Sequence, residues 1–154
     1  MKITDLLNPA AITDEMTATC KSDALAELAD ALLRVEKGLD RDTIIQAVQE
    51  REYLGSTGIG QGVAIPHGKL KNLDHMLVSL GRSRAGVDFQ SMDDLPAHLF
   101  FYLLAPEDSH GEHLKLLARI SKLLKNPEVR QRLMDAVGGE GIFRIISEEE
   151  DKLL

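Results

Sequence analysis

The stretch Gly55-Ser-Thr-Gly-Ile-Gly-Gln-Gly-Val-Ala-Ile-Pro-His-Gly-Lys69 is the most informative part of this 154-residue chain. Its glycines and hydroxyl residues lead into an apolar run that favours a strand over Val63 to Ile65, and Pro66 ends that run. His67 follows between a proline and a glycine, with nothing bulky on either side. The pattern predicts an imidazole presented to solvent at the end of a strand, which suits a nucleophile that must meet another macromolecule.

Two common glycine-rich motifs do not fit this stretch. A nucleotide-binding P-loop needs Ser or Thr after its Gly-Lys pair, whereas Leu70 follows Lys69 here. A dinucleotide-binding fingerprint needs a strand before the glycines and a helix after them, whereas the order expected here is helix, glycine loop, strand. The spacing alone leaves open that the glycines serve only a tight turn and that His67 is an ordinary exposed residue.

Apolar periodicity on both sides of the stretch predicts alternating helices and strands. Before it, Ser22 is expected to cap a helix that ends at Gly38, and Asp40 to cap a second helix that reaches about Tyr53. After it, the pattern predicts two strands, over 77–81 and 99–104, and three helices, over 112–125, from Asn126-Pro127 onward, and over about 140–146. The alternation predicts one α/β domain over residues 1–154, with a mixed sheet flanked by helices on both faces. The acidic end, 148–151, is expected to be solvated.

Composition predicts a compact cytoplasmic protein. A single cysteine, Cys20, excludes an internal disulfide, and the N-terminus lacks the features of a signal peptide. The longest apolar run, Leu99 to Ala105, is too short to cross a membrane, so no membrane insertion is expected. The net charge of −7 argues against nucleic acid as a main partner, because phosphate binding needs clustered Lys and Arg.

The segment Glu52, then Ile59-Gly60, then Val63-Ala-Ile-Pro-His-Gly68 resembles a known phosphorylation-site signature. It is the signature of the fructose/mannitol (type 2) family of phosphotransferase-system (PTS) EIIA proteins. Four segments also resemble the nitrogen-related regulatory branch of that family: Ile3–Pro9, Gly55–Gly60, Leu104–Asp108 and His113–Ala118. The resemblance extends from about Ile3 to about Ile146. It implies a sheet of about four to five strands and a phosphoryl group accepted by His67 through Nε2, from the phosphocarrier protein HPr or its nitrogen-branch counterpart.

Two further residues are candidates for the same chemistry. Arg51 is expected in the last turn of its helix, where it either complements the helix C-terminus or directs its guanidinium at a phosphoryl group. Ser109 and Glu112 have the spacing of a capping box, which would place His113 in a first helical turn and keep its ring neutral. His113 is then either a surface histidine or a neutral hydrogen-bond donor. The resemblance favours an active-site role for both Arg51 and His113.

Other kinds of site are less well supported by the sequence. His110 and His113 have one-face helical spacing, but neither a cysteine pair nor a His-Glu-x-x-His motif accompanies them, so zinc is a minor alternative. His75 and His98 are expected to be structural, as is His110 outside that alternative. Ser56 and Thr57 are either hydroxyl donors to the site or plain turn residues. No cofactor is expected, because phosphate would pass between two proteins.

Two functions remain open for such a carrier. In the regulatory reading, phosphorylation changes the affinity of the protein for its target proteins, as the nitrogen-related resemblance implies. In the alternative reading, a stand-alone sugar-specific EIIA passes its phosphate to an EIIB of a fructose/mannitol-type permease. The similarity of Leu104–Asp108 to the nitrogen-related branch favours regulation.

Overall fold

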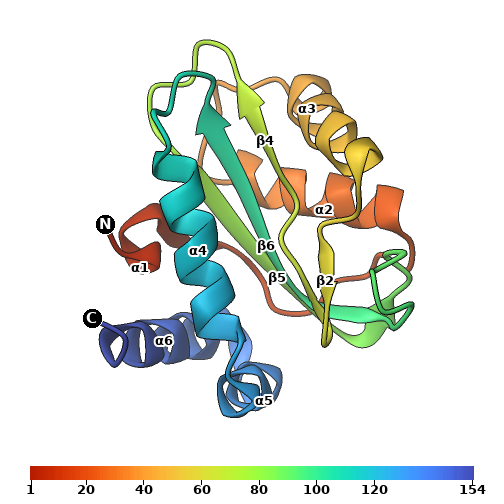
Figure 1. The fold of residues 1–154 in the computed structure, drawn as a ribbon, viewed down its shortest axis with the longest axis vertical. Coiled ribbons are helices and arrows are strands. Elements are labelled where there is room, and N and C mark those ends of the chain that lie inside the picture. Colours follow the sequence, from red (N-terminus) through yellow and green to blue (C-terminus); the bar gives the residue numbers. More distant parts are fainter.

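A mixed sheet forms the centre of the protein, and the computed structural model describes all of residues 1–154 (Figure 1). Two long central strands, β5 (Leu77–Val87) and β6 (Ala97–Pro106), run antiparallel to each other. Strand β1 (Leu7–Thr13) pairs in parallel with β5. On the other side, β6 has two parallel partners, β3 (Val63–Ala64) and β4 (His67–Leu70).

Strands β3 and β4 behave as one strand that is interrupted at Ile65 and Pro66. Val63 pairs with Leu99 on β6, and His67 pairs with Leu103 four positions further along the same strand. The short strand β2 (Gly58–Gly60) folds back antiparallel on β3 at the sheet edge. The prediction of a mixed sheet with about four to five strands is confirmed, with β3 and β4 counted as one. The strand predicted over Val63 to Ile65 is β3 and ends one residue earlier than predicted, and a further strand, which was not predicted, begins at His67.

Six helices surround the sheet, on both of its faces, as predicted (Figure 1). One face is covered by α2 (Lys21–Leu33) and α3 (Arg41–Leu54). The opposite face is covered by α1 (Ile3–Leu6), α4 (Glu112–Leu124), α5 (Pro127–Asp135) and α6 (Gly138–Asp151).

The alternation of side chains along β6 explains how one strand serves both layers. Phe100 and Tyr102 pack against α2 and α3, whereas Leu99, Phe101 and Leu103 pack against the helices of the other face. All five are buried. A strand that is apolar on both faces belongs in the middle of a three-layer structure, which is where β6 lies.

Three predicted helix boundaries are wrong. Helix α2 begins at Lys21 with Cys20 as its N-cap instead of Ser22, because Cys20 has an extended backbone and forms a β-bridge with Asp88. The same helix ends at Leu33, well before Gly38. Helix α6 is longer than predicted and includes the acidic residues 148–151.

The acidic end of the chain is not simply solvated. Glu150 is only 2% exposed, and its carboxylate accepts hydrogen bonds from the backbone N–H groups of Ile3 and Thr4. It therefore satisfies the open N-terminus of α1, a helix that the sequence patterns did not predict. None of the helices is both long enough and apolar enough to span a membrane.

Candidate functional site

His67 is the first residue of β4 and is half-buried at the break after Pro66. Its Nδ1 lies 2.8 Å from the backbone oxygen of Ile65. A carbonyl oxygen can only accept, so Nδ1 carries a hydrogen, and the neutral ring has its free lone pair on Nε2. Burial lowers the pKa of His67 and outweighs the Ile65 hydrogen bond, which acts to raise it; the charge of Arg51 lowers it further, and that of Glu52 raises it. The ring is therefore neutral near pH 7.

Strand β4 lies unusually close to α3, and Gly68 makes this approach feasible. A Cβ atom added to Gly68 would lie 3.0 Å from the backbone C and O of Ala47 and 3.1 Å from the N of Val48. These distances are shorter than ordinary contacts between heavy atoms. The glycine after His67 thus fixes how the histidine sits relative to the helix that carries Arg51.

Arg51 lies in the last turn of α3, as predicted. Its Nη1 donates to the backbone oxygen of Gly55 at 2.9 Å, so it holds the first residue of the glycine loop. The guanidinium has five N–H donors, and most of them remain free for another acceptor. Its charge acts, after burial, to lower the pKa of His67.

His113 is the second residue of α4, but the predicted capping box is wrong. The N-cap is Gly111, whose positive φ of 83° favours glycine, and it lies two residues after Ser109. The hydroxyl of Ser109 instead lies 2.8 Å from Nδ1 of His113 and orients that ring. Burial lowers the pKa of His113, and the charges of Lys69 and His67 lower it further.

Glu52 and Lys21 were not predicted as site residues. The Glu52 carboxylate is buried and accepts hydrogen bonds from the backbone N–H and the hydroxyl of Thr57 and from Nζ of Lys21. Burial acts to raise the pKa of Glu52, but these bonds outweigh it and hold the pKa below its usual range. The one available signal was the position of Glu52 within the sequence signature; nothing in the sequence indicated Lys21.

The hydroxyl groups of Ser56 and Thr57 in the glycine loop form hydrogen bonds with nearby residues. Thr57 is buried and its hydroxyl donates to Glu52, whereas the hydroxyl oxygen of Ser56 accepts from the backbone N–H of Gly58 at 3.0 Å. Both residues shape the loop that precedes His67.

The remaining histidines lie in separate surroundings. His75 bridges Asp74 and Glu36, and Nδ1 of His98 lies 2.8 Å from the backbone oxygen of Ser83. His110 precedes α4 and has a positive φ of 54°. The structure contains no group of three or more His, Cys, Asp or Glu side chains arranged to hold a metal ion.

Comparison with known proteins places the chain in a family. Residues 5–149 match the model of the phosphoenolpyruvate-dependent sugar phosphotransferase system, EIIA 2. The chain therefore belongs to the type 2 EIIA family, and the predicted resemblance is confirmed.

Individual relatives narrow the comparison. The chain is 38% identical to a nitrogen regulatory protein of Bradyrhizobium diazoefficiens, over 96% of this chain and 95% of that protein. It is 37% identical to the PTS system fructose-specific EIIABC component of Bacillus subtilis, over 97% of this chain but only 24% of that longer protein. Its fold matches the crystal structure of nitrogen regulatory protein IIA-Ntr from Neisseria meningitidis with a TM-score of 0.87 and 33% identity, over 94% of this chain and 98% of that one. The chain thus resembles nitrogen regulatory proteins over nearly its whole length.

Proposed function

We propose that His67 accepts a phosphoryl group from an HPr-type phosphocarrier protein through Nε2. The observation that carries this proposal is the hydrogen bond from Nδ1 to the Ile65 carbonyl, which leaves the lone pair of a neutral ring on Nε2. In the transfer, that lone pair forms a new N–P bond while the N–P bond to the donor's histidine breaks and its electron pair stays on the donor nitrogen. The donor ring, protonated on its other nitrogen, leaves as a neutral imidazole, and the phosphorylated ring of His67 carries the positive charge until it releases its Nδ1 proton to water.

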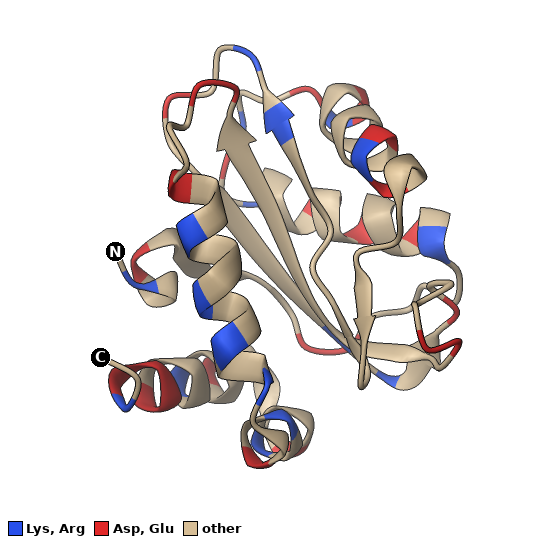
Figure 2. Ribbon diagram, viewed as in Figure 1, with Lys and Arg blue, Asp and Glu red and all other residues tan.

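Arg51 and His113 are the charge-stabilising partners in this proposal. The transition state of phosphoryl transfer is loose, so a protein contributes mainly by positioning and by stabilising charge on the equatorial oxygens. The planar guanidinium of Arg51 suits two of these oxygens, and the neutral ring of His113 can donate from Nε2 when Nδ1 accepts from Ser109. Figure 2 shows that basic residues also lie on β4 and along α4, the two elements that carry His67 and His113.

The setting of the reaction follows from the family. Residues 1–154 would form one type 2 EIIA domain that acts in the cytoplasm, where the phosphocarrier proteins of the system are expected. No cofactor is needed, because the group moves between two histidines.

The protein would act as a regulator whose affinity for partner proteins depends on whether His67 is phosphorylated. The similarity to nitrogen regulatory proteins over nearly the full length of both chains supports this reading. A phosphoryl group adds nearly two negative charges at His67, which changes affinity for any partner that docks there. In the alternative, the protein passes its phosphate to an EIIB; the similarity to part of a fructose-specific EIIABC component supports this second reading.

The first experiment identifies the phosphorylated residue. The purified protein is incubated with phosphoenolpyruvate, enzyme I and HPr, and the product is examined by mass spectrometry under alkaline conditions, which preserve phosphohistidine. One phosphoryl group on His67 is expected, and none on His67→Ala, whereas His98→Ala should be labelled like the wild type. Stoichiometric labelling of His67→Ala would refute the proposal.

The second experiment separates the helpers and the two readings. Arg51→Ala and His113→Ala should slow single-turnover phosphorylation by about 10²–10³-fold, the usual effect of removing one charge-stabilising donor. The phosphorylated protein is then mixed with a purified fructose-type EIIB. Rapid loss of phosphate to EIIB would favour the sugar-specific carrier, and retention of the phosphate would favour the regulator.

A further inference from the structure

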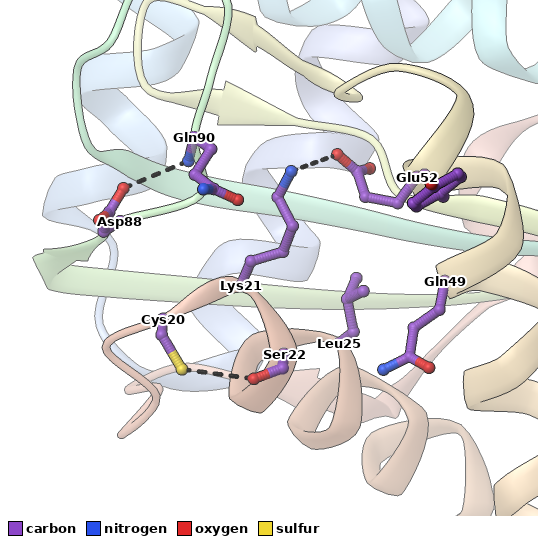
Figure 3. A pocket seen from close by; sticks show the side chains of 9 residues that line it. Cys20, Lys21, Ser22, Leu25, Gln49, Glu52, Asp88 and Gln90 are labelled. Carbon is purple, nitrogen blue, oxygen red and sulfur yellow. Dashed lines mark hydrogen bonds and ion pairs between the residues drawn. The ribbon is translucent and has the colours of Figure 1, made fainter.

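An unbroken path of hydrogen bonds connects a lysine on α2 with the imidazole ring of His67. The path begins where Nζ of Lys21 donates to Oε2 of Glu52 at 2.7 Å, across the space between α2 and α3 (Figure 3). The Glu52 carboxylate then accepts the backbone N–H of Thr57, with both oxygens 3.1 Å from that nitrogen. The hydroxyl of Thr57 donates to the same carboxylate.

The second half of the path runs through the backbone. The carbonyl of Thr57 accepts the N–H of Ile65 at 3.0 Å. The carbonyl of the same Ile65 accepts Nδ1–H of His67 at 2.8 Å. Ile65 lies in the gap between β3 and β4, where the regular sheet pairing with β6 is interrupted. Thr57 therefore supplies a contact to this peptide at a point where the sheet ladder does not.

We propose that Lys21 and Glu52 are positioning residues for His67. They fix Thr57, whose carbonyl holds the N–H of Ile65, and the carbonyl of Ile65 in turn holds the imidazole with its proton on Nδ1. Neither residue touches the phosphoryl group. The consequence for the rate of transfer rests on the function proposed above, whereas the consequence for the ring tautomer does not.

The surroundings of the ion pair suit this role. The side chains of Lys21 and Glu52 are only 20% and 5% exposed, so water screens their attraction little. A buried carboxylate is stable only when donors surround it, and Glu52 has three: Nζ of Lys21 and the N–H and hydroxyl of Thr57. The charged carboxylate of Glu52 therefore holds the glycine loop in one position, at Thr57.

Lys21 is held in place by a second contact. Its Nζ lies 4.8 Å from the centre of the Phe89 ring, a cation–π geometry that keeps the ammonium directed toward Glu52. Lys21 and Glu52 also line a pocket of about 490 Å³, together with residues such as Gln49 and Gln90 (Figure 3). Substitution of Lys21 therefore leaves no closed cavity in the core, so Lys21 is a better residue than Glu52 with which to test the path.

The experiment uses the full chain and three substitutions along the path. Glu52→Gln keeps the shape but removes the charge, Lys21→Met removes the ammonium and keeps the chain length, and Lys21→Arg restores the cation. The matched control is Glu149→Gln, which removes a carboxylate that is 10% exposed and 2.7 Å from both Arg132 and Lys152, on the opposite layer. Folding of each variant is checked by its amide NMR spectrum.

Two readouts separate positioning from general stability. The ring ¹⁵N shifts of His67 report the tautomer: the wild type and Lys21→Arg should show Nδ1–H alone, whereas Glu52→Gln and Lys21→Met should show a mixture. Single-turnover phosphorylation should be about ten- to a hundredfold slower in the same two variants, the usual effect of a reacting group displaced by up to an ångström. Glu149→Gln should match the wild type in both readouts.

The outcomes are distinct. Unchanged tautomer in folded Glu52→Gln and Lys21→Met would overturn the inference, whatever the rate. If the wild type itself takes no phosphoryl group on His67, the proposed function fails, and the tautomer still tests the positioning. If Glu52→Gln does not fold, Lys21→Met with its rescue by arginine decides the question alone.

Discussion

Replacing Gly68 with alanine should disturb both the packing and the chemistry of the site. The new Cβ would meet the backbone of Ala47 at 3.0 Å, whereas ordinary carbon contacts lie at about 3.5–4.0 Å, so β4 and α3 must separate by roughly half an ångström. The atoms in conflict are backbone atoms, so no rotation of a side chain can relieve the contact. Overpacking of this kind costs about 1–3 kcal/mol of unfolding free energy.

The same displacement should slow phosphorylation, because it moves His67 relative to Arg51. A misplacement of about 1 Å can cost about a hundredfold in rate, so half of it corresponds to about tenfold. Urea unfolding measures the first effect and single-turnover phosphorylation the second.

A matched control is available on the opposite face of the sheet. Gly141 lies within α6, and a Cβ there would have its nearest neighbour at 3.7 Å, an ordinary contact. Gly141→Ala should therefore leave the rate unchanged and raise stability by about 0.5–1 kcal/mol. If Gly68→Ala matches the wild type in both unfolding free energy and rate, the close approach of β4 to α3 does not constrain the site.

Three further results are expected. In an NMR titration, His67 should titrate below its ordinary pKa, because burial first and Arg51 next disfavour its charged form; its contribution to stability is then present above about pH 6.5 and is lost as the pH falls through the lowered pKa. His75 should behave oppositely, because hydrogen bonds to two carboxylates raise its pKa. Its contribution to the unfolding free energy is present below about pH 6.5 and is lost as the pH rises through the raised pKa. Urea unfolding curves of His75→Gln and of the wild type, recorded at several pH values, would measure this difference. Tyr102→Phe should be neutral or stabilising by about 1 kcal/mol in urea unfolding, because the buried hydroxyl has no hydrogen-bond partner in the protein, and exposed Tyr53→Phe should have no effect; a loss of more than about 1 kcal/mol in Tyr102→Phe would show that the hydroxyl is bonded.

Elements with local signals were predictable from the sequence. Helix α3 begins after Asp40, whose carboxylate accepts the backbone N–H of Thr43, and helix α5 begins at Pro127 after the cap Asn126. These interactions join residues that are close together in the sequence, so a local sequence pattern is enough to predict where each helix begins.

Elements that depend on distant partners were not predictable. Strand β2 contains two glycines in three residues and exists because it pairs with β3. The acidic residues at the end of α6 have the composition of a solvated tail, yet Glu150 is buried because α1 offers it backbone N–H groups from the other end of the chain. A sequence pattern does not show which distant residue will contact such a side chain in the fold, and here that contact makes a residue that prefers solvent become buried.

The residues of the candidate site also fall into those that the sequence predicted and those that it did not. His67, Arg51 and His113 were predicted because each lies in a recognisable motif; in the structure the charge of Arg51 lowers the pKa of His67, and that of His67 lowers the pKa of His113, in each case after burial. Lys21 lies 31 positions before Glu52 and was missed, since no spacing rule connects side chains on two neighbouring helices. The proposed chemistry is thus visible in the sequence, whereas its support is visible only in the fold.

The charges around His67 serve two states of the ring. Burial first, and the charge of Arg51 in addition, disfavour a protonated His67, which would keep the proposed nucleophile neutral before transfer. After transfer, a phosphoryl group with nearly two negative charges would occupy the same region, and the cation that repelled a proton would then attract the product. Burial and then Lys69 lower the pKa of His113 in the same way, which would keep that ring available as a neutral donor. Cations beside a neutral His67 would therefore have two effects. They lower the pKa of the ring before transfer, and they would stabilise the negative charge of the phosphoryl group after transfer. The whole protein carries a net charge of −7, so in the proposed transfer these cations would offset a surrounding negative field.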